Sequence, residues 1–256
     1  MSIEKKIGIL TFHASYNCGS MLQTYAMQTY LNKLGYNCEV INFSTEAQKK
    51  LYSLYTRKKN PKYLMRDLIF WCHHKRIESN FKRYELFKTN VFHLSKTSAE
   101  KTEEICIDEY EYLIAGSDQI WNITISDYDD AYFLPWNGVK KIAYAPSFGA
   151  RNPAEYSDCV DKYIKYMMDF DYLSVREKNG QKWIKQLTGK DVPVVLDPTL
   201  LIEKKDYEPI VSDELSLPKK YIFYYSPTYS IPINKMVKKI SKKYNMPVIA
   251  FNSKAY

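Results

Sequence analysis

The chain has 256 residues, 45% of them hydrophobic, with 37 Lys or Arg against 29 Asp or Glu and a formal net charge of +8. This length and apolar content suffice for one large domain, or for one domain and part of a second. A polar N-terminus and the absence of any run of about eighteen apolar residues predict no signal peptide and no membrane-spanning helix, so we expect a cytoplasmic protein. Five cysteines without CxxC pairs indicate reduced thiols rather than disulfides or structural zinc.

Short apolar runs alternate with helical periodicities along the chain, which predicts an α/β protein with a largely parallel sheet and helices on both faces. Strands are expected at 6–12, 38–42, 111–116, 141–146, 172–176 and 193–196, and helices at 19–34, 156–170 and 178–188. Together these elements predict a Rossmann-like N-terminal domain over residues 1–208. Gly35 follows the first helix and is well placed to end it.

Residues 209–220 contain two prolines and two serines and are expected to be a linker. Beyond it, a strand at 221–225, a helix at 234–244 and a strand at 247–251 predict a partial second α/β domain over 221–256. Two strands and one helix bury too little apolar surface to fold alone. We therefore expect this unit to be part of a truncated longer protein, or to dock on the first domain or on another subunit.

The excess positive charge is concentrated in an insertion at about residues 46–95. Between Lys49 and Lys88 stand twelve Lys or Arg and three acidic residues. Apolar residues from Leu64 to Cys72 recur at helical spacing, which predicts a helical hairpin with a solvated cationic face. The same charge can attract anionic lipid or a phosphate-rich substrate, so peripheral membrane contact is an alternative. No nucleic-acid-binding signature accompanies it, and nucleic acid is not an expected partner.

Several predicted strands end in polar loops, and the clearest case is the segment from Glu111 to Asn122. A buried strand stops at Gly116, and the polar cluster after it contains Ser117, Asp118, Gln119, Trp121 and Asn122. In parallel α/β sheets, ligands bind outside the carboxyl ends of the strands. The polar side chains can hydrogen-bond a ligand there, and the Trp121 ring can stack on a sugar. The alternative is a helix N-cap followed by a core tryptophan.

The first loop, residues 11–20, joins a strand to a helix N-terminus. Unpaired N–H groups and the helix dipole favour an anion there, and Gly19 lets a ligand approach the backbone. The loop is neither a dinucleotide fingerprint nor a Walker motif, so ordinary capping by Asn17 or Ser20 is an equal alternative. His13 can act as an acid or base near neutral pH, although a lone histidine in a loop is more often structural.

Arg176 closes a predicted strand, where its planar guanidinium can grip a phosphate or a carboxylate. The alternative is a salt bridge to Glu177 or to an acidic neighbour such as Asp197. The loops 145–149 and 197–201 also follow strands, and their simplest roles are turn formation and helix entry.

Taken in order, five segments resemble the polysaccharide pyruvyl transferase family. They lie between residues 7 and 201 and read GILTFHASYNCGSMLQTYAM, AGSDQIWN, IAYAPSFG, SVRE and VLDPTLL. The resemblance implies a two-domain, GT-B-like fold with the active site between two Rossmann-like halves. It also implies transfer of pyruvate from phosphoenolpyruvate onto sugar hydroxyls as a ketal, with release of phosphate.

Such a reaction needs an acid, a base and cationic groups that hold the donor, and it requires no metal and no cofactor besides the donor substrate. The residues expected to bind phosphoenolpyruvate are Arg176, Asn17, Gly19 and Ser20. Asp118 is the expected base toward the acceptor hydroxyl, and His13 is the expected proton donor. The acceptor is expected to be a glycan or lipid-linked sugar of a cell-surface polysaccharide, and its contacts are Ser117, Gln119, Trp121 and Asn122.

The chain departs from this family in one respect. Members typically carry, in the second domain, an arginine and a histidine separated by one residue, which help to bind and activate the donor. All four histidines here, at 13, 73, 74 and 93, lie in the first half, and nothing after Asn245 matches the element. A truncated gene or a partner polypeptide that supplies the missing half would account for this. Two alternatives therefore stay open, a non-catalytic glycan- or anion-binding remnant and a nucleotide-sugar glycosyltransferase, and a homo-oligomer is a further expectation.

Overall fold

The fold comes from a computed structural model that describes residues 6–53, 68, 71, 74–212, 215–226 and 230–251. Backbone contacts divide the chain into two units, Met1–Glu208 and Pro209–Tyr256. The apolar helical stripe expected between Leu64 and Cys72 lies almost wholly outside the described residues. Leu68 and Trp71, the two positions of that stretch that are described, both have exposed side chains.

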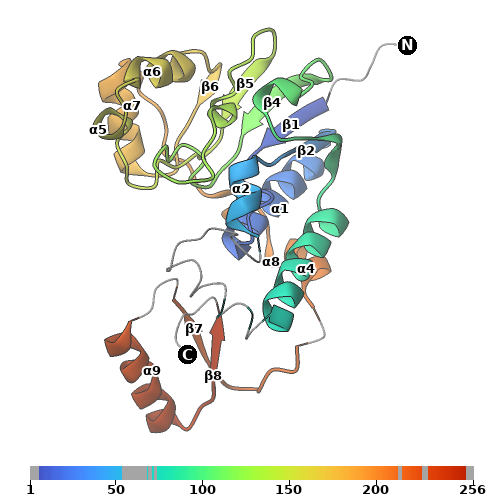
Figure 1. Ribbon diagram of the computed structural model, residues 1–256, viewed down its shortest axis with the longest axis vertical. Helices are drawn as coiled ribbons and strands as arrows, with labels where there is room; N and C mark the ends of the chain where they lie inside the picture. Colours follow the sequence, from blue (N-terminus) through green and yellow to red (C-terminus); the bar gives the residue numbers. More distant parts are fainter. Residues whose placement is uncertain are drawn as a thin grey trace. The chain divides into compact units, whose positions relative to one another are not determined.

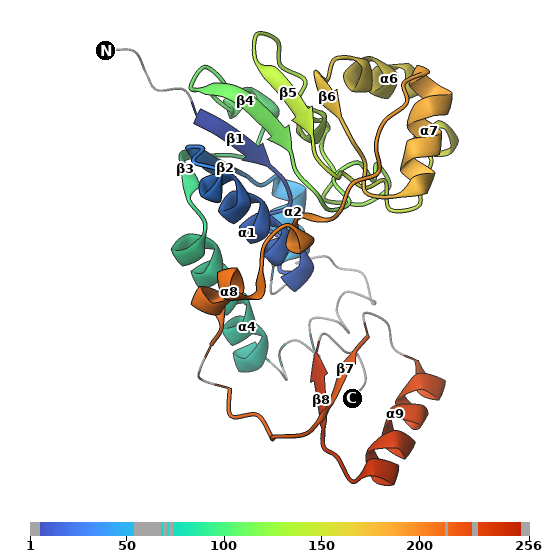
Figure 2. The same ribbon diagram turned by 180° about the vertical axis from the view of Figure 1, so that it is seen from behind.

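In the first unit, the described residues form a six-stranded parallel sheet in the order β3-β2-β1-β4-β5-β6, as Figure 2 shows. The strands are β1 (Lys6–Leu10), β2 (Cys38–Phe43), β3 (Leu94–Ala99), β4 (Tyr110–Ala115), β5 (Lys140–Ala143) and β6 (Tyr172–Leu173). This is the order of the doubly wound nucleotide-binding fold, in which the sheet grows outward from β1 on one side and from β4 on the other. The α/β class and the parallel sheet expected from the sequence are confirmed.

Capping residues set the ends of the first helix. The helix begins after Asn17, whose side chain accepts a hydrogen bond from the Gly19 N–H at 2.8 Å, and it is followed by Gly35 at φ +84°. The α-helices described in this unit are α1 (Cys18–Lys33), α2 (Glu46–Leu51), α4 (His74–Val91), α5 (Pro153–Tyr156), α6 (Val160–Met168), α7 (Lys178–Thr188) and α8 (Lys204–Tyr207) (Figure 1). The helix expected at 156–170 corresponds to α6, which is shorter than expected, and the short helix α5 precedes it.

Both faces of the sheet are buried, because successive side chains on a strand point to opposite sides. Ile9 of β1 belongs to one apolar cluster together with Met27 of α1. Leu10, its neighbour, belongs to a second cluster that contains Met167 of α6 and Ile184 of α7. Helices therefore cover both faces of the sheet, as the alternating pattern predicted.

The strands expected at 141–146 and 172–176 are shorter than expected, and two others differ more strongly. β3 was not predicted, because it is an edge strand and the residues Lys96, Thr97 and Ser98 are exposed, so it lacks the apolar alternation of a buried strand. The strand expected at 193–196 is reduced to an isolated bridge between Val175 and Val194. Prolines stand on both sides of that short stretch, and proline cannot donate to a ladder.

A Gly8→Ala substitution should lower the free energy of unfolding by about 1–3 kcal/mol, because neighbouring side chains already fill the space that the added methyl group on β1 would need. A Cβ at Gly8 would lie 2.9 Å from Ile41 Cδ1 and 2.9 Å from Leu113 Cδ2. Urea unfolding measures the change, with Lys96→Ala on the exposed edge as a control that should stay within about 0.5 kcal/mol. A Gly8→Ala protein as stable as the control would contradict this packing.

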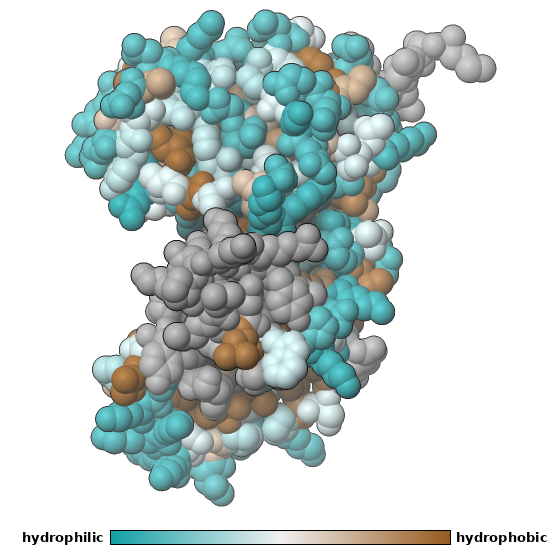
Figure 3. Space-filling view, viewed as in Figure 1, coloured by the Kyte–Doolittle hydropathy of each residue, from teal (hydrophilic) through white to brown (hydrophobic). Residues whose placement is uncertain are grey.

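The second unit is a small βαβ arrangement. β7 (Ile222–Tyr225) and β8 (Val248–Phe251) pair in parallel, and α9 (Ile231–Tyr244) connects them (Figure 1). Apolar side chains such as Phe223 remain exposed on this unit, whereas the face of the first unit seen in Figure 3 is mostly hydrophilic. Among the helices of both units that the structure describes, none is long and apolar enough to cross a bilayer.

Candidate functional site

The loops that follow β1 and β4 meet where the strand order reverses. The two strands are neighbours, with Leu10 opposite Ala115 at their carboxyl ends. The chain continues from β1 to β2 on one side and from β4 to β5 on the other, which makes this a topological switch point. Ligands of doubly wound sheets bind in the crevice outside such a point. The polar residues predicted in these two loops therefore lie at the binding edge of the fold.

Asp118 is fixed at this edge by contacts from two directions. Its Oδ2 accepts a hydrogen bond from the hydroxyl of Ser20 on α1 at 2.5 Å, and its Oδ1 accepts one from the Gln119 N–H at 2.7 Å. Its backbone has φ +80°, in the left-handed region that non-glycine residues rarely adopt. Backbone strain of this kind concentrates at functional sites, and here it accompanies a half-buried carboxylate held in one orientation.

Arg176 forms the salt bridge to Asp197 that the sequence analysis considered as an alternative to ligand binding. Its Nη1 donates to Asp197 Oδ2 at 2.8 Å and to the hydroxyl of Ser117 at 3.3 Å, and Ser117 in turn donates to Asp197 Oδ2 at 3.1 Å. Burial raises the pKa of Asp197, but hydrogen bonds from Thr199 and Arg176 outweigh it and bring the pKa below its usual value. The guanidinium is thus held beside an ionised carboxylate at neutral pH.

In the first loop, the backbone group expected to bind an anion is already hydrogen-bonded to the helix-capping residue. The Gly19 N–H is hydrogen-bonded to the Asn17 side chain, which is the capping alternative considered from the sequence. Ser20 is buried and turned toward Asp118. Because Ser117 precedes Asp118 in the chain and contacts Arg176, the Ser20–Asp118 hydrogen bond and the guanidinium are held by consecutive residues of the β4 loop.

The other residues expected to contact the acceptor sugar lie around the β4 loop and differ in their exposure to solvent. Trp121 is fully buried, its Nε1–H donates to the Tyr132 C=O at 2.9 Å, and its ring stacks on Phe133. No face of the ring is open to a sugar, so the core-tryptophan alternative describes it. Gln119 is exposed, and its side chain accepts a hydrogen bond from the buried Asn122 side chain at 3.1 Å.

His13 is fully buried beneath the first loop. Its ring nitrogens lie 3.3 Å from the Thr11 C=O and 3.2 Å from Asn42 Oδ1. Burial lowers the pKa of His13 to about 4, with the charge of Lys88 acting in the same direction. A buried, neutral imidazole is not available to donate a proton to a ligand near neutral pH, so this position does not support the proton-donor role expected from the sequence.

The stability of the chain should fall on acidification because of His13. An unfolded histidine binds its proton near pH 6.5, whereas folded His13 has a pKa of about 4. The stabilisation is therefore complete above about pH 6.5 and declines by up to roughly 3 kcal/mol as the pH falls toward 4. Urea unfolding between pH 7.5 and 4.5 measures the slope, which His13→Gln should flatten. An unchanged slope in His13→Gln would contradict this assignment.

Two residues near Asp118 were not found by sequence reasoning. Asp127 is buried, and burial together with the charge of Asp118 raises its pKa. Burial also raises the pKa of Tyr52 to about 12, with Asp127 and Asp118 contributing. Both residues therefore lie within electrostatic reach of Asp118. No motif marked them, because one follows the β4 loop and the other ends α2, and only tertiary packing brings them together.

Three of the described cations of the basic insertion, Lys49, Lys50 and Lys88, form ion pairs. Lys49 contacts Glu100 at 2.6 Å and Lys88 contacts Glu85 at 2.7 Å. Four further cations of this segment, Lys75, Arg76, Lys82 and Arg83, are exposed on α4, in agreement with the solvated cationic face expected from the sequence. Among the residues that the structure describes, no group of three or more His, Cys, Asp or Glu is placed to hold a metal ion.

The fold and this edge define a doubly wound α/β protein with a carboxylate and a guanidinium near its topological switch point. A family model described as polysaccharide pyruvyl transferase matches residues 17–252. The chain therefore belongs to the polysaccharide pyruvyl transferase family, a family of transferases in polysaccharide biosynthesis, and the resemblance seen in the sequence is confirmed. No curated protein and no solved structure matches the chain.

Proposed function

We propose that this protein transfers pyruvate from phosphoenolpyruvate onto two hydroxyls of a sugar in a cell-surface polysaccharide or its precursor. Family membership supports the reaction class, and the orientation of Asp118 at the switch point carries the assignment of the site. In this proposal the first unit is one half of a GT-B-like pair, and residues 209–256 belong to the second half.

The chemistry assigns a task to each kind of group. A proton is added to the methylene carbon of phosphoenolpyruvate, a sugar hydroxyl attacks the adjacent carbon, and phosphate leaves before a second hydroxyl closes the ketal. Of the two hydroxyl protons, one balances the new methyl group and the other leaves with phosphate. Asp118 accepts the proton of the attacking hydroxyl, because its carboxylate is pre-oriented by Ser20 and by the Gln119 N–H.

Arg176 holds the phosphate or the carboxylate of the donor in this proposal. Both of its described hydrogen bonds use Nη1, and the side chain is 28% exposed, so a ligand can approach the guanidinium from the solvent side. Asn17, Gly19 and Ser20 line the same edge, where the N-terminus of α1 adds positive potential.

The test is acceptor-dependent release of phosphate from phosphoenolpyruvate by the full chain. Release that requires a glycan and is lost in Arg176→Ala supports the proposal. Protection from unfolding by a nucleoside diphosphate, without any by phosphoenolpyruvate, would favour a nucleotide-sugar glycosyltransferase. Stabilisation by phosphoenolpyruvate without turnover, in the presence of every acceptor tried, would point to a binding remnant.

A further inference from the structure

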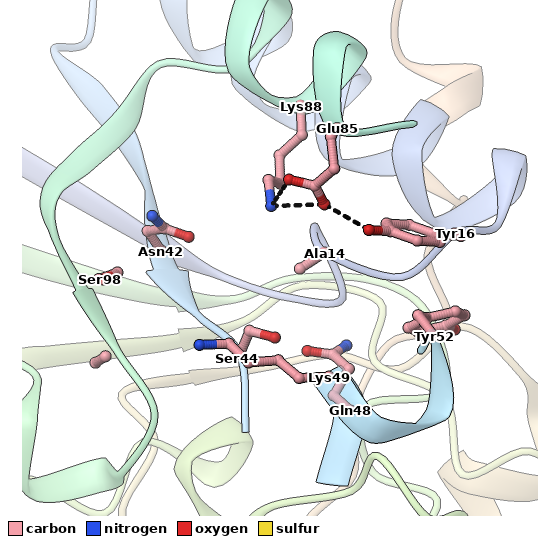
Figure 4. A pocket seen from close by; sticks show the side chains of 11 residues that line it. Ala14, Tyr16, Asn42, Ser44, Gln48, Lys49, Tyr52, Glu85, Lys88 and Ser98 are labelled. Atoms are coloured by element: carbon pink, nitrogen blue, oxygen red, sulfur yellow. Dashed lines mark hydrogen bonds and ion pairs between the residues drawn. The ribbon is translucent and has the colours of Figure 1, made fainter. Parts of the chain in front are cut away.

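A cavity of about 300 Å³ opens beside the switch point, at the carboxyl ends of β2 and β3 (Figure 4). Helices α2 and α4 and the first loop close its other sides, and its wall is formed largely by polar side chains. This volume is at the lower end of the range for small-molecule sites. The cavity therefore has room for a ligand of about the size of one sugar ring.

The charges around the cavity are balanced. Lys88 on one wall is paired with Glu85 at 2.7 Å, and Lys49 on another is paired with Glu100 at 2.6 Å. Tyr16 donates a further hydrogen bond to Glu85 at 2.9 Å, as Figure 4 shows. A multiply charged anion would have to compete with these carboxylates for the same lysines. The wall thus favours an uncharged, hydroxyl-bearing ligand over phosphoenolpyruvate or phosphate.

One buried hydrogen-bond acceptor in the cavity wall, Gln48 Oε1, can pair with a hydroxyl of such a ligand. Gln48 is 1% exposed, and its Nε2 donates to the Ser15 hydroxyl at 3.1 Å. Its Oε1 has no hydrogen-bond partner among the described residues, and Figure 4 shows the amide turned toward the cavity. A buried carbonyl oxygen without a donor is costly, and a ligand hydroxyl would satisfy it.

Aromatic side chains form one end of the cavity. The rings of Tyr16 and Tyr52 lie 4.9 Å apart, and both side chains line the space (Figure 4). Rings that combine an apolar body with a polar tip suit the mixed surface of a sugar. Burial raises the pKa of Tyr52 to about 12, and the charges of Asp127 and Asp118 make smaller contributions in the same direction.

We propose that this cavity binds an uncharged pyranose ring of the acceptor glycan, with a hydroxyl donating to Gln48 Oε1. This inference rests on the proposed function for the identity of the glycan as an acceptor. It adds that recognition of the acceptor involves the β2–β3 end of the sheet and that the donor binds elsewhere, at the edge that carries Arg176.

The experiment is an NMR titration of the full chain with three probes, the methyl glycosides of glucose, galactose and mannose. At least one should shift the backbone amides of Gln48, Lys49 and Ser98, whereas inorganic phosphate and phosphoenolpyruvate should not. Gln48→Met, which removes the acceptor oxygen, should weaken binding of that glycoside about tenfold. Lys50→Met on the same helix is the matched control, because Lys50 is exposed and pairs with Glu46 outside the cavity.

A second variant keeps the proposal testable if Gln48→Met does not fold. Ser98→Tyr, on an exposed position of the edge strand, should fill the cavity and abolish the glycoside shifts without unfolding the chain. No shift with any of the three glycosides, or shifts of these amides by phosphate, would overturn the proposal. Glycoside shifts without phosphate release would leave the cavity assignment standing and count against pyruvyl transfer. Phosphate release without the glycoside shifts would support pyruvyl transfer and overturn the assignment of the cavity.

Discussion

An Asp118→Asn variant should fold normally and lose acceptor-dependent phosphate release from phosphoenolpyruvate by about 10²- to 10⁴-fold. Asparagine keeps the size of the side chain: its Oδ1 can still accept the hydrogen bond from the Gln119 N–H, and its Nδ2 can donate to the Ser20 hydroxyl in place of the bond that Asp118 Oδ2 accepts. It cannot take a proton from a sugar hydroxyl. The loss should therefore fall on turnover, while the KM for the donor stays near its original value because Arg176 is unchanged.

Two further variants separate proton transfer from positioning. Ser20→Ala removes the hydroxyl that orients Asp118 Oδ2 but leaves the carboxylate, so it should reduce turnover by less than Asp118→Asn. Asp108→Asn changes an exposed carboxylate and should have no effect. Steady-state phosphate release measures all three. An Asp118→Asn enzyme with nearly full activity would remove Asp118 from the mechanism and with it the main support for the site.

The fold was predictable where the sequence pattern follows from burial. Both faces of the central strands are covered, so β1, β2 and β4 appear as short apolar runs, and the helices between them show 3.6-residue periodicity. β3 was missed because an edge strand with exposed Lys96 and Ser98 has no such run. The sequence predicted a largely parallel sheet, but it did not predict the order of the strands, which creates the switch point.

The site was predictable where residues follow strand ends directly. Ser117, Asp118 and Arg176 come together because the carboxyl ends of parallel strands share one edge. Asp127 and Tyr52 reach Asp118 through a long loop and through helix α2, and no local pattern encodes that approach. The burial of individual site residues was not predictable from the sequence around them either. His13 and Trp121 stand in polar segments of the sequence, yet both are fully enclosed.

A Trp121→Ala substitution should lower the free energy of unfolding by about 3–5 kcal/mol, because it empties a large volume in the centre of the core. The indole stacks on Phe133 at 4.6 Å between ring centroids, and the centroids of the tilted Phe148 and Phe170 rings lie 5.4 and 5.6 Å from it. The substitution also leaves the Tyr132 C=O without its indole donor. Both losses act on the folded state and neither involves a ligand.

The control is Trp136→Ala, because Trp136 is only partly buried against the same cluster and should cost clearly less. Urea unfolding gives both values, and the same samples can be titrated with a glycan. If Trp121 supports the loop from the core, Trp121→Phe should recover most of the lost stability and leave glycan affinity unchanged. A stable Trp121→Ala protein with weakened glycan binding would instead place the ring against the sugar, which requires a conformation of the β4 loop in which the indole has left the stack with Phe133.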